Sequence, residues 1–224
     1  MGHMICSQLV GLLKACHFGP TVLVVTITYV LSRTQFSIND SLFIAAAILL
    51  GQFVVGWSND LIDFPRDSAA RRVKKPLVAG TITETTLRIS IGIAIVVALV
   101  VSLLSPLGVS GTAIHFLGLL SATAYNLKLK STLLSVVPYI VSFGALPWAI
   151  YVAADSTPPT WIVLGFIFIS SAFHFLNVLK DLESDLNQGV MGMPQVLGRQ
   201  KSIAMAIILA GLGILDVALA NMWL

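Results

Sequence analysis

Long apolar stretches, each about the length of a membrane span, are the feature of this sequence that most limits its fold. A helix needs about 20 apolar residues to cross a bilayer core. Hydrophobic residues make up 57% of the 224-residue chain and charged residues only 10%, whereas a soluble domain carries about 25% charged residues. The sequence therefore predicts an all-α, polytopic membrane helical bundle rather than a soluble enzyme. Seven stretches are predicted to span the membrane: 9–31, 41–57, 86–104, 111–127, 132–154, 160–179 and 202–222.

Basic residues are distributed unevenly between the two sides of these spans. All of the 13 Lys and Arg residues except Arg33 fall on one side of the predicted membrane. Because basic loops stay in the cytoplasm, the long polar loops 58–85 and 180–201 are predicted to be cytoplasmic loops of a cell (inner or plasma) membrane protein. We expect a short N-terminal cytoplasmic segment, residues 1–8, followed by a single transmembrane domain, residues 9–224.

The first acidic cluster lies where the second predicted span reaches the cytoplasm. Asp60, Asp63 and Asp67 are spaced by three and four residues, which places them on one side of a helix. The residue before a proline disfavours helical geometry, so Pro65 leaves the direction of Asp67 open. Counting back from Asp63 in steps of four, three and four residues, the same spacing places further residues on one helix face with it: Asn59, Gly56 and Gln52.

A second acidic cluster lies at the cytoplasmic end of the sixth predicted span. Asn177, Asp181 and Asp185 repeat every four residues, and His174 extends that stripe one turn deeper. Oxygen ligands of this type suit hard cations, and Mg²⁺ in particular is usually held by a few carboxylates together with substrate phosphates. The alternative for each cluster is a set of solvated charges at the membrane surface.

Basic residues are expected close to both acidic clusters, at the cytoplasmic ends of the predicted spans. Lys74 and Lys75 come after the first cluster, and Tyr125, Lys128 and Lys130 end the fourth predicted span. Lysines would repel a bare cation, whereas a Mg²⁺-chelated diphosphate accounts for carboxylates and lysines together, because lysine meets the remaining phosphate charge. For Lys74 and Lys75 alone, the cytoplasmic charge bias is the alternative explanation.

These motifs together resemble the UbiA superfamily of intramembrane prenyltransferases. The first cluster reads Asn59-Asp60-x-x-Asp63-x-x-x-Asp67, and the second reads Asp181-x-x-x-Asp185. Lys75-Pro76-Leu77-x-x-Gly80 is similar to the family's basic segment, and Tyr125 with Lys128 is similar to its Tyr-and-Lys pair. The likeness covers essentially the whole chain in helix order. The segments around His17 and Trp57 are similar to a poorly characterised actinobacterial branch.

The resemblance implies nine helices around a central cavity and transfer of an isoprenyl group from a prenyl diphosphate. The acceptor it implies is an aromatic, quinone-precursor-like molecule or another lipophilic molecule. Membrane lipid is the other expected partner, and no nucleic acid is expected to bind. It implies Mg²⁺ as cofactor, held by Asp60, Asp63, Asp67, Asp181 and Asp185, of which all but Asp67 are expected to be catalytic. Contacts to the diphosphate are expected from Asn59, Lys75, Tyr125, Lys128 and Asn177. His174 and Gln52 are expected near the acceptor.

The sequence departs from that family in two respects. Only seven spans are predicted before Leu224, so the sequence is either truncated or belongs to a short subfamily. The family often has an arginine in its first helix facing the phosphates, whereas Lys14 and His17 are the nearest candidates here.

Other readings of the sequence remain. A related enzyme that transfers a phosphoribosyl group to a lipid carrier would use the same metal–diphosphate chemistry. A transporter would place its polar residues at the midplane of broken helices, and a non-catalytic membrane protein would need neither motif. Asp216 is an isolated acid within the last span, which marks it as a candidate functional residue. Cys6 and Cys16 are expected to be free thiols.

Overall fold

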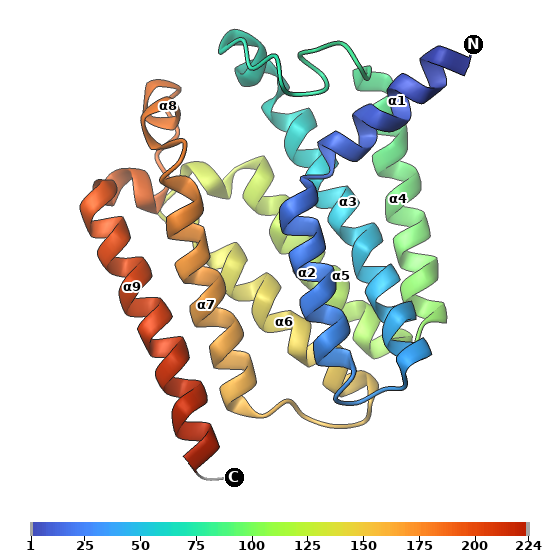
Figure 1. Ribbon diagram of the computed structural model, residues 1–224, viewed down its shortest axis with the longest axis vertical. Coiled ribbons are helices and arrows are strands. Elements are labelled where there is room, and N and C mark those ends of the chain that lie inside the picture. The colour runs from blue at the N-terminus through green and yellow to red at the C-terminus, as the bar shows by residue number, and fades with distance from the viewer. Residues whose placement is uncertain (1, 223–224) are drawn as a thin grey trace. The chain divides into compact units, whose positions relative to one another are not determined.

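The structure, a computed structural model, describes residues 2–222, with the side chains of residues 7–220 and 222 (Figure 1). The described chain is helical and contains no strand, which confirms the all-α prediction. The helices are α1 (Gly2–Ala15), α2 (Phe18–Ser32), α3 (Ile38–Ala69), α4 (Glu84–Leu104), α5 (Gly108–Leu127), α6 (Val137–Ala153), α7 (Thr160–Val178), α8 (Leu182–Asn187) and α9 (Met193–Met222), with the 3₁₀ helix η1 (Leu129–Ser131). They form two compact units, residues 1–112 and 113–224, each described by itself below.

The first unit is built around α3, against which α2 and α4 both pack (Figure 1). Local sequence signals start its helices: the Ser37 side chain accepts a hydrogen bond from the Asp40 amide, and Thr83 does the same for Thr86. α1 and α2 meet at a bend of 64°. At this bend His17 has the left-handed φ of 54°, so the first predicted span is a broken helix whose junction exposes a polar side chain.

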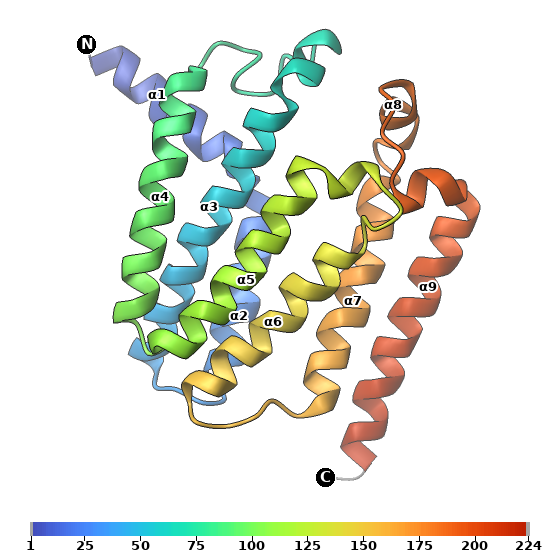
Figure 2. The ribbon, with the colours of Figure 1, turned by 180° about the vertical axis from the view of Figure 1, so that it is seen from behind.

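The second unit contains most of α5, followed by α6, α7 and α9, of which α6 and α9 each pack against α7 (Figure 2). The Ser142 hydroxyl of α6 donates to the Gly118 carbonyl of α5 over 2.9 Å, which ties these two helices together. α9 begins with a short helical turn and is then broken at Gly198, whose φ of 76° and ψ of 170° are not helical. This break separates the first residues of α9 from its long apolar part.

Fewer helices satisfy the length and hydropathy of a membrane span than the seven predicted. In the described part of the chain, α3, α4, α7 and α9 are long and apolar enough, and the bent α1–α2 pair makes a fifth. The other two predicted spans are helical but fall short. α6 has 17 residues, and the Ser, Thr, His and Asn residues of α5 lower its mean hydropathy.

Near the acidic clusters, the helices agree with the predicted spacing for the first cluster and differ from it for the second. α3 continues through Pro65 to Ala69, so the whole first cluster lies on one helix. The second cluster does not: α7 ends at Val178, a turn follows, and α8 begins after Asp181. The predicted four-residue stripe from His174 to Asp185 is therefore interrupted. Residues 2–8, expected to precede the first span, lie in α1.

Candidate active site

The last turns of α3 carry the first acidic cluster, and their position is set by close packing against the α1–α2 bend. A Cβ added at Gly56 would lie 2.8 Å from the carbonyl carbon and oxygen of Cys16, so only glycine allows this approach. The Trp57 indole donates to the Leu12 carbonyl over 2.9 Å, and the Thr21 hydroxyl donates to the Cys16 carbonyl over 2.7 Å. These contacts hold the bend, and with it His17, against α3.

Asp60 is the most strongly engaged carboxylate of this cluster. It is 3% exposed, and its Oδ1 accepts hydrogen bonds from both Lys75 Nζ and His17 Nε2, the latter over 3.0 Å. Asn59 Nδ2 lies 3.5 Å from the same imidazole nitrogen. Because Nε2 donates to the carboxylate, Asn59 lies beside it rather than donating to it. Burial of an ionised carboxylate requires such partners, since an unpaired buried charge is strongly disfavoured.

The other two carboxylates of the cluster also have basic partners. Arg66 pairs with Asp63 one turn earlier on α3. Asp67, 3% exposed, accepts from Arg72 over 3.2 Å, and its second oxygen lies 4.0 Å from Lys75 Nζ. Lys75 is thus placed between Asp60 and Asp67, so one ammonium group faces two carboxylates.

Lys75 is held in place by the segment that follows it. Leu77 and Ile82 are buried with Ala15 of α1 and Leu87 of α4, in a small core that Trp57 also contacts. Gly80 has a φ of +69°, which glycine adopts without strain. This turn lets the Thr81 hydroxyl and amide both donate to the Pro76 carbonyl, over 3.1 Å. The motif around Lys75 is therefore an anchored loop rather than a free basic tail.

The chemistry of this cluster fits a hard divalent cation. Carboxylate oxygens are the ligands that Mg²⁺ prefers, and proteins usually supply one or two of them while substrate phosphates supply the rest. Asp60 and Asp67 could supply two such carboxylates, and both face the same positive group, the Lys75 ammonium. Among the described residues, no three His, Cys, Asp or Glu side chains converge closely enough to hold a metal alone. Substrate phosphates and water are the further oxygen ligands that Mg²⁺ usually takes.

The second acidic motif lies in the other unit, where α7 gives way to α8. Asp181 is exposed at the N-cap of α8, and its carbonyl accepts from the Asp185 amide over 2.8 Å. Asp185 Oδ2 accepts from Gln195 Nε2 over 2.9 Å. Asn177, at the end of α7, accepts from Lys180 over 3.3 Å. Asp181 and Asp185 thus come from one helical turn, whereas Asn177 belongs to the helix before it.

His174, expected near the acceptor, is completely buried within the second unit. Its Nε2 lies 3.1 Å from the Ser135 hydroxyl, and its ring contacts Tyr125 and Tyr139, with centroids 5.8 and 4.7 Å away. Its Nδ1 has no hydrogen-bond partner among the described residues. Tyr125 is therefore part of an aromatic cluster with His174 and Tyr139.

The remaining predicted site residues lie outside these clusters. Lys128 is exposed next to η1. Gln52 is partly buried on α3, two turns before Asn59. In α9, Asp216 Oδ2 has no hydrogen-bond partner within the described chain, and it faces Gly165 of α7, where an added Cβ would lie 3.8 Å away. Cys16 is a buried free thiol, as expected, whereas the Cys6 side chain lies outside the described residues.

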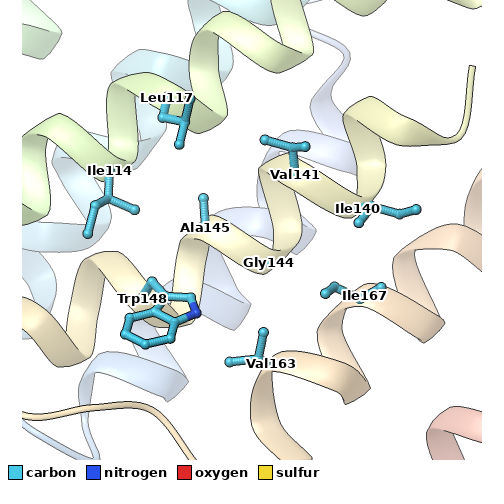
Figure 3. A pocket seen from close by; sticks show the side chains of 9 residues that line it. All are labelled: Ile114, Leu117, Ile140, Val141, Gly144, Ala145, Trp148, Val163 and Ile167. Atoms are coloured by element: carbon cyan, nitrogen blue, oxygen red, sulfur yellow. The ribbon is translucent and has the colours of Figure 1, made fainter. Parts of the chain in front are cut away.

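An apolar pocket of about 360 Å³ lies between α5, α6 and α7 of the second unit. Every residue that lines it is apolar. Figure 3 shows Ile114 and Leu117 of α5 pointing towards α6, with Trp148 of α6 and Ile167 of α7 on other sides. At Gly144, which also lines the pocket, an added Cβ would lie 3.3 Å from Ile167. The pocket is an open groove with apolar walls, which suit contact with a hydrocarbon chain.

Several residues around the motifs could not be selected from the sequence. His17 and Lys14 are the candidates for a basic contact from the first helix, and in the structure the bend at Cys16 brings His17 to Asp60. From the sequence, Arg66 and Arg72 fit the cytoplasmic charge bias. In the structure, both pair with carboxylates of the first acidic cluster. The contact of Gln195 with Asp185 could not be predicted, because an isolated glutamine ten residues after Asp185 matches no expected motif.

Comparison with known proteins identifies the fold and the family. The chain superimposes on a UbiA homologue from Archaeoglobus fulgidus bound to GPP and Mg²⁺, with a TM-score of 0.80 and 13% identity over 96% of this chain and 78% of that one. The same homologue bound to Cd²⁺ gives a TM-score of 0.79 at 13% identity, covering 96% of this chain and 79% of the other. A digeranylgeranylglyceryl phosphate synthase gives 0.71 at 19% identity, covering 96% and 78%.

A search of the curated proteins finds no significant match. The sequence profile of the UbiA prenyltransferase family, in contrast, matches residues 19–224, which include both acidic motifs and the Lys75 loop. The predicted resemblance is therefore confirmed: this chain belongs to the UbiA prenyltransferase family and is an intramembrane prenyltransferase of the multi-pass helical type.

Proposed function

We propose that the protein transfers an isoprenyl group from a prenyl diphosphate to a lipophilic acceptor in a Mg²⁺-dependent reaction. The observation that carries the proposal is Asp60, a buried carboxylate at the end of a membrane helix, shared by Lys75 and His17. The carboxylate suits the cation of a metal-bound diphosphate, and Lys75, which also faces Asp67, suits the phosphate oxygens of the same ligand. A related structure with GPP and Mg²⁺ bound supports this assignment.

Each candidate residue has a role in this proposal that follows from its chemistry. Asp60, Asp63, Asp67, Asp181 and Asp185 hold Mg²⁺, which supplies positive charge for the departing diphosphate. Lys75 exchanges its carboxylate partners for a phosphate oxygen, and Lys128 and Tyr125 donate to the same group. Asn59 and Asn177 supply further polar contacts. Charge that develops on the leaving group is thereby stabilised by fixed groups.

The apolar pocket of the second unit supports a substrate with a hydrocarbon chain. Such a chain would bury apolar surface against the side chains of Ile114, Leu117 and Ile167. We assign the acceptor to the class of aromatic, quinone-precursor-like molecules, with His174 and Gln52 nearest to it.

We further propose that the protein lies in the cell membrane with both motif-bearing loops in the cytoplasm. The asymmetry of basic residues supports this orientation, since Arg33 alone falls on the opposite side. A water-soluble diphosphate head would then reach the site from the cytoplasm while its chain stays in the membrane.

The proposal is tested with purified protein in lipid nanodiscs. Prenyl diphosphates of increasing chain length are incubated with a panel of aromatic acceptors, with Mg²⁺ or with EDTA, and products are detected by mass spectrometry. We expect prenylated product that requires Mg²⁺ and is lost in Asp63→Asn. The control Glu84→Gln, which alters only an exposed pair with Arg88, should keep wild-type turnover. Transfer that persists in EDTA would contradict the proposed metal dependence, and phosphoribosylated lipid would replace the proposed reaction.

A further inference from the structure

The Asp60 carboxylate binds both of its hydrogen-bond donors through one oxygen. His17 Nε2 donates to Oδ1 over 3.0 Å, and Lys75 Nζ donates to the same atom. Among the described residues, no donor contacts the other oxygen, Oδ2. The carboxylate is therefore anchored through one oxygen, and the second oxygen is available to a further ligand.

The His17 imidazole is held in place through the backbone around it. The Thr21 amide donates to the His17 carbonyl over 3.2 Å, and the Thr21 hydroxyl donates to the Cys16 carbonyl over 2.7 Å. The Cys16 backbone in turn packs against α3 at Gly56, where an added Cβ would lie 2.8 Å away. Because a short side chain on an anchored bend has few other positions, His17 is a fixed donor.

Lys75, in contrast, is an exchangeable donor. Its ammonium group is carried by a flexible four-carbon chain, and it faces Asp67 Oδ2 at 4.0 Å as well as Asp60. On the proposed function, Lys75 exchanges its carboxylate partners for a phosphate oxygen when the prenyl diphosphate binds. Asp60 then keeps one donor, the His17 imidazole.

We infer that His17 is a positioning residue for Asp60, which it holds through Oδ1 so that Oδ2 can receive the cation while Lys75 moves to the diphosphate. This role rests on the proposed function. Hydrogen-bond partners of a metal-binding carboxylate orient it, and their loss typically lowers metal affinity by about tenfold to a hundredfold. The role predicts that the imidazole acts only through Asp60, and that a neutral donor of similar reach can replace it.

The test compares variants at position 17 with and without a donor. His17→Phe keeps a ring and removes the donor, whereas His17→Gln supplies a neutral amide donor. Binding of Mn²⁺ in the presence of geranyl diphosphate is followed by electron paramagnetic resonance, alongside steady-state kinetics. Because the imidazole is 38% exposed, we expect His17→Phe to weaken Mn²⁺ binding by about tenfold, the lower end of the usual range. His17→Gln should recover most of the affinity, and His17→Ala, a second variant without the donor, should show the same loss as His17→Phe.

Two comparisons separate this role from a general effect of charge or packing. Lys14 is exposed on α1, three residues before His17. Lys14→Gln removes a positive charge near the bend and leaves the Asp60 contacts in place, so it should bind Mn²⁺ as the wild type does. In an Asp60→Asn background, measured at higher Mn²⁺ concentrations, His17→Phe should cause no further loss.

The outcomes distinguish the two hypotheses. Wild-type protein that binds no Mn²⁺ with geranyl diphosphate would overturn the proposed function and this role with it. Wild-type protein that binds Mn²⁺, together with unchanged His17→Phe and His17→Ala variants, would overturn the role of His17 alone. A loss in His17→Gln as large as that in His17→Phe would also overturn it, as would equal losses from His17→Phe in the wild-type and Asp60→Asn backgrounds.

Discussion

At the scale of single residues, the first acidic cluster depends on how its charges are shared. Lys75 faces Asp60 and Asp67 together, and Asp60 has His17 as a second partner. This arrangement places positive groups beside both carboxylates at the end of a membrane helix, where isolated charges would be costly. Lys75 therefore serves the resting protein by neutralising charge, and on the proposed function it also serves the diphosphate.

Neutralising Lys75 should weaken binding of the prenyl donor. In Lys75→Gln the diphosphate loses a charge-assisted hydrogen bond worth about 1.5–3 kcal/mol, so KM should rise by about tenfold to a hundredfold. Steady-state transfer assays on variants inserted into membranes measure this change. The control Arg88→Gln removes a basic residue from the same unit whose partner Glu84 is exposed. Wild-type kinetics in Lys75→Gln would remove this lysine from the site.

At the scale of helices, the position of the α1–α2 bend depends on its close packing against the end of α3. The bend gives His17 its left-handed conformation, and Gly56 allows the backbone at Cys16 to approach α3. Without that approach the imidazole could not reach Asp60. The position of the His17 side chain thus depends on the absence of a methyl group on the neighbouring helix.

Gly56→Ala tests this dependence. The added Cβ would lie 2.8 Å from the Cys16 backbone, so the bend must move. Overpacking of this kind costs about 1–3 kcal/mol, and we expect a lower Tm in detergent together with a weaker response of activity to His17→Ala. Gly92→Ala on α4 is the matched control, because nothing lies within 4 Å of its added Cβ. A Tm equal to that of Gly92→Ala would show that the close approach is not required.

Helical periodicity predicted the first cluster well and the second only in part. Asp60, Asp63 and Asp67 do share a helix, because α3 absorbs Pro65 and continues to Ala69. The spacing of Asn177, Asp181 and Asp185 also fits a helix, yet the chain turns after Val178. Spacing indicates which residues could share a helix face. Where a helix ends also depends on contacts between residues distant in sequence, such as Arg199 with the Leu179 carbonyl just after α7.

At the scale of the whole molecule, each unit contributes one acidic motif, and the proposed reaction needs both. Asp63→Ala and Asp185→Ala should each abolish Mg²⁺-dependent binding of the prenyl donor. On the proposed function both variants remove ligands of the same metal–diphosphate group, so the double variant should be scarcely worse than either single one. Binding titrations with geranyl diphosphate and Mg²⁺ measure all three. Losses that multiply would indicate two independent sites.

The orientation of the protein is also a property of the whole chain. If basic loops remain in the cytoplasm, cysteines introduced at Ser68 and Asn187 should resist a membrane-impermeant reagent in intact cells and react after lysis. A background with Cys6→Ser and Cys16→Ser removes the native thiols, and a cysteine at Thr34, next to Arg33, gives the opposite control. Labelling at Ser68 or Asn187 in intact cells would reverse the proposed orientation.

The pairing of the first cluster has a consequence for the order in which ligands bind. A Mg²⁺ ion arriving alone must displace Lys75, which would then be left near a doubly charged cation without a partner. When the diphosphate arrives with the metal, it gives that ammonium group a new anionic partner. On the proposed function, metal and prenyl donor therefore raise each other's affinity reciprocally. Binding of the two ligands would then be cooperative, so free magnesium alone would leave the enzyme largely unloaded until its lipid substrate is present.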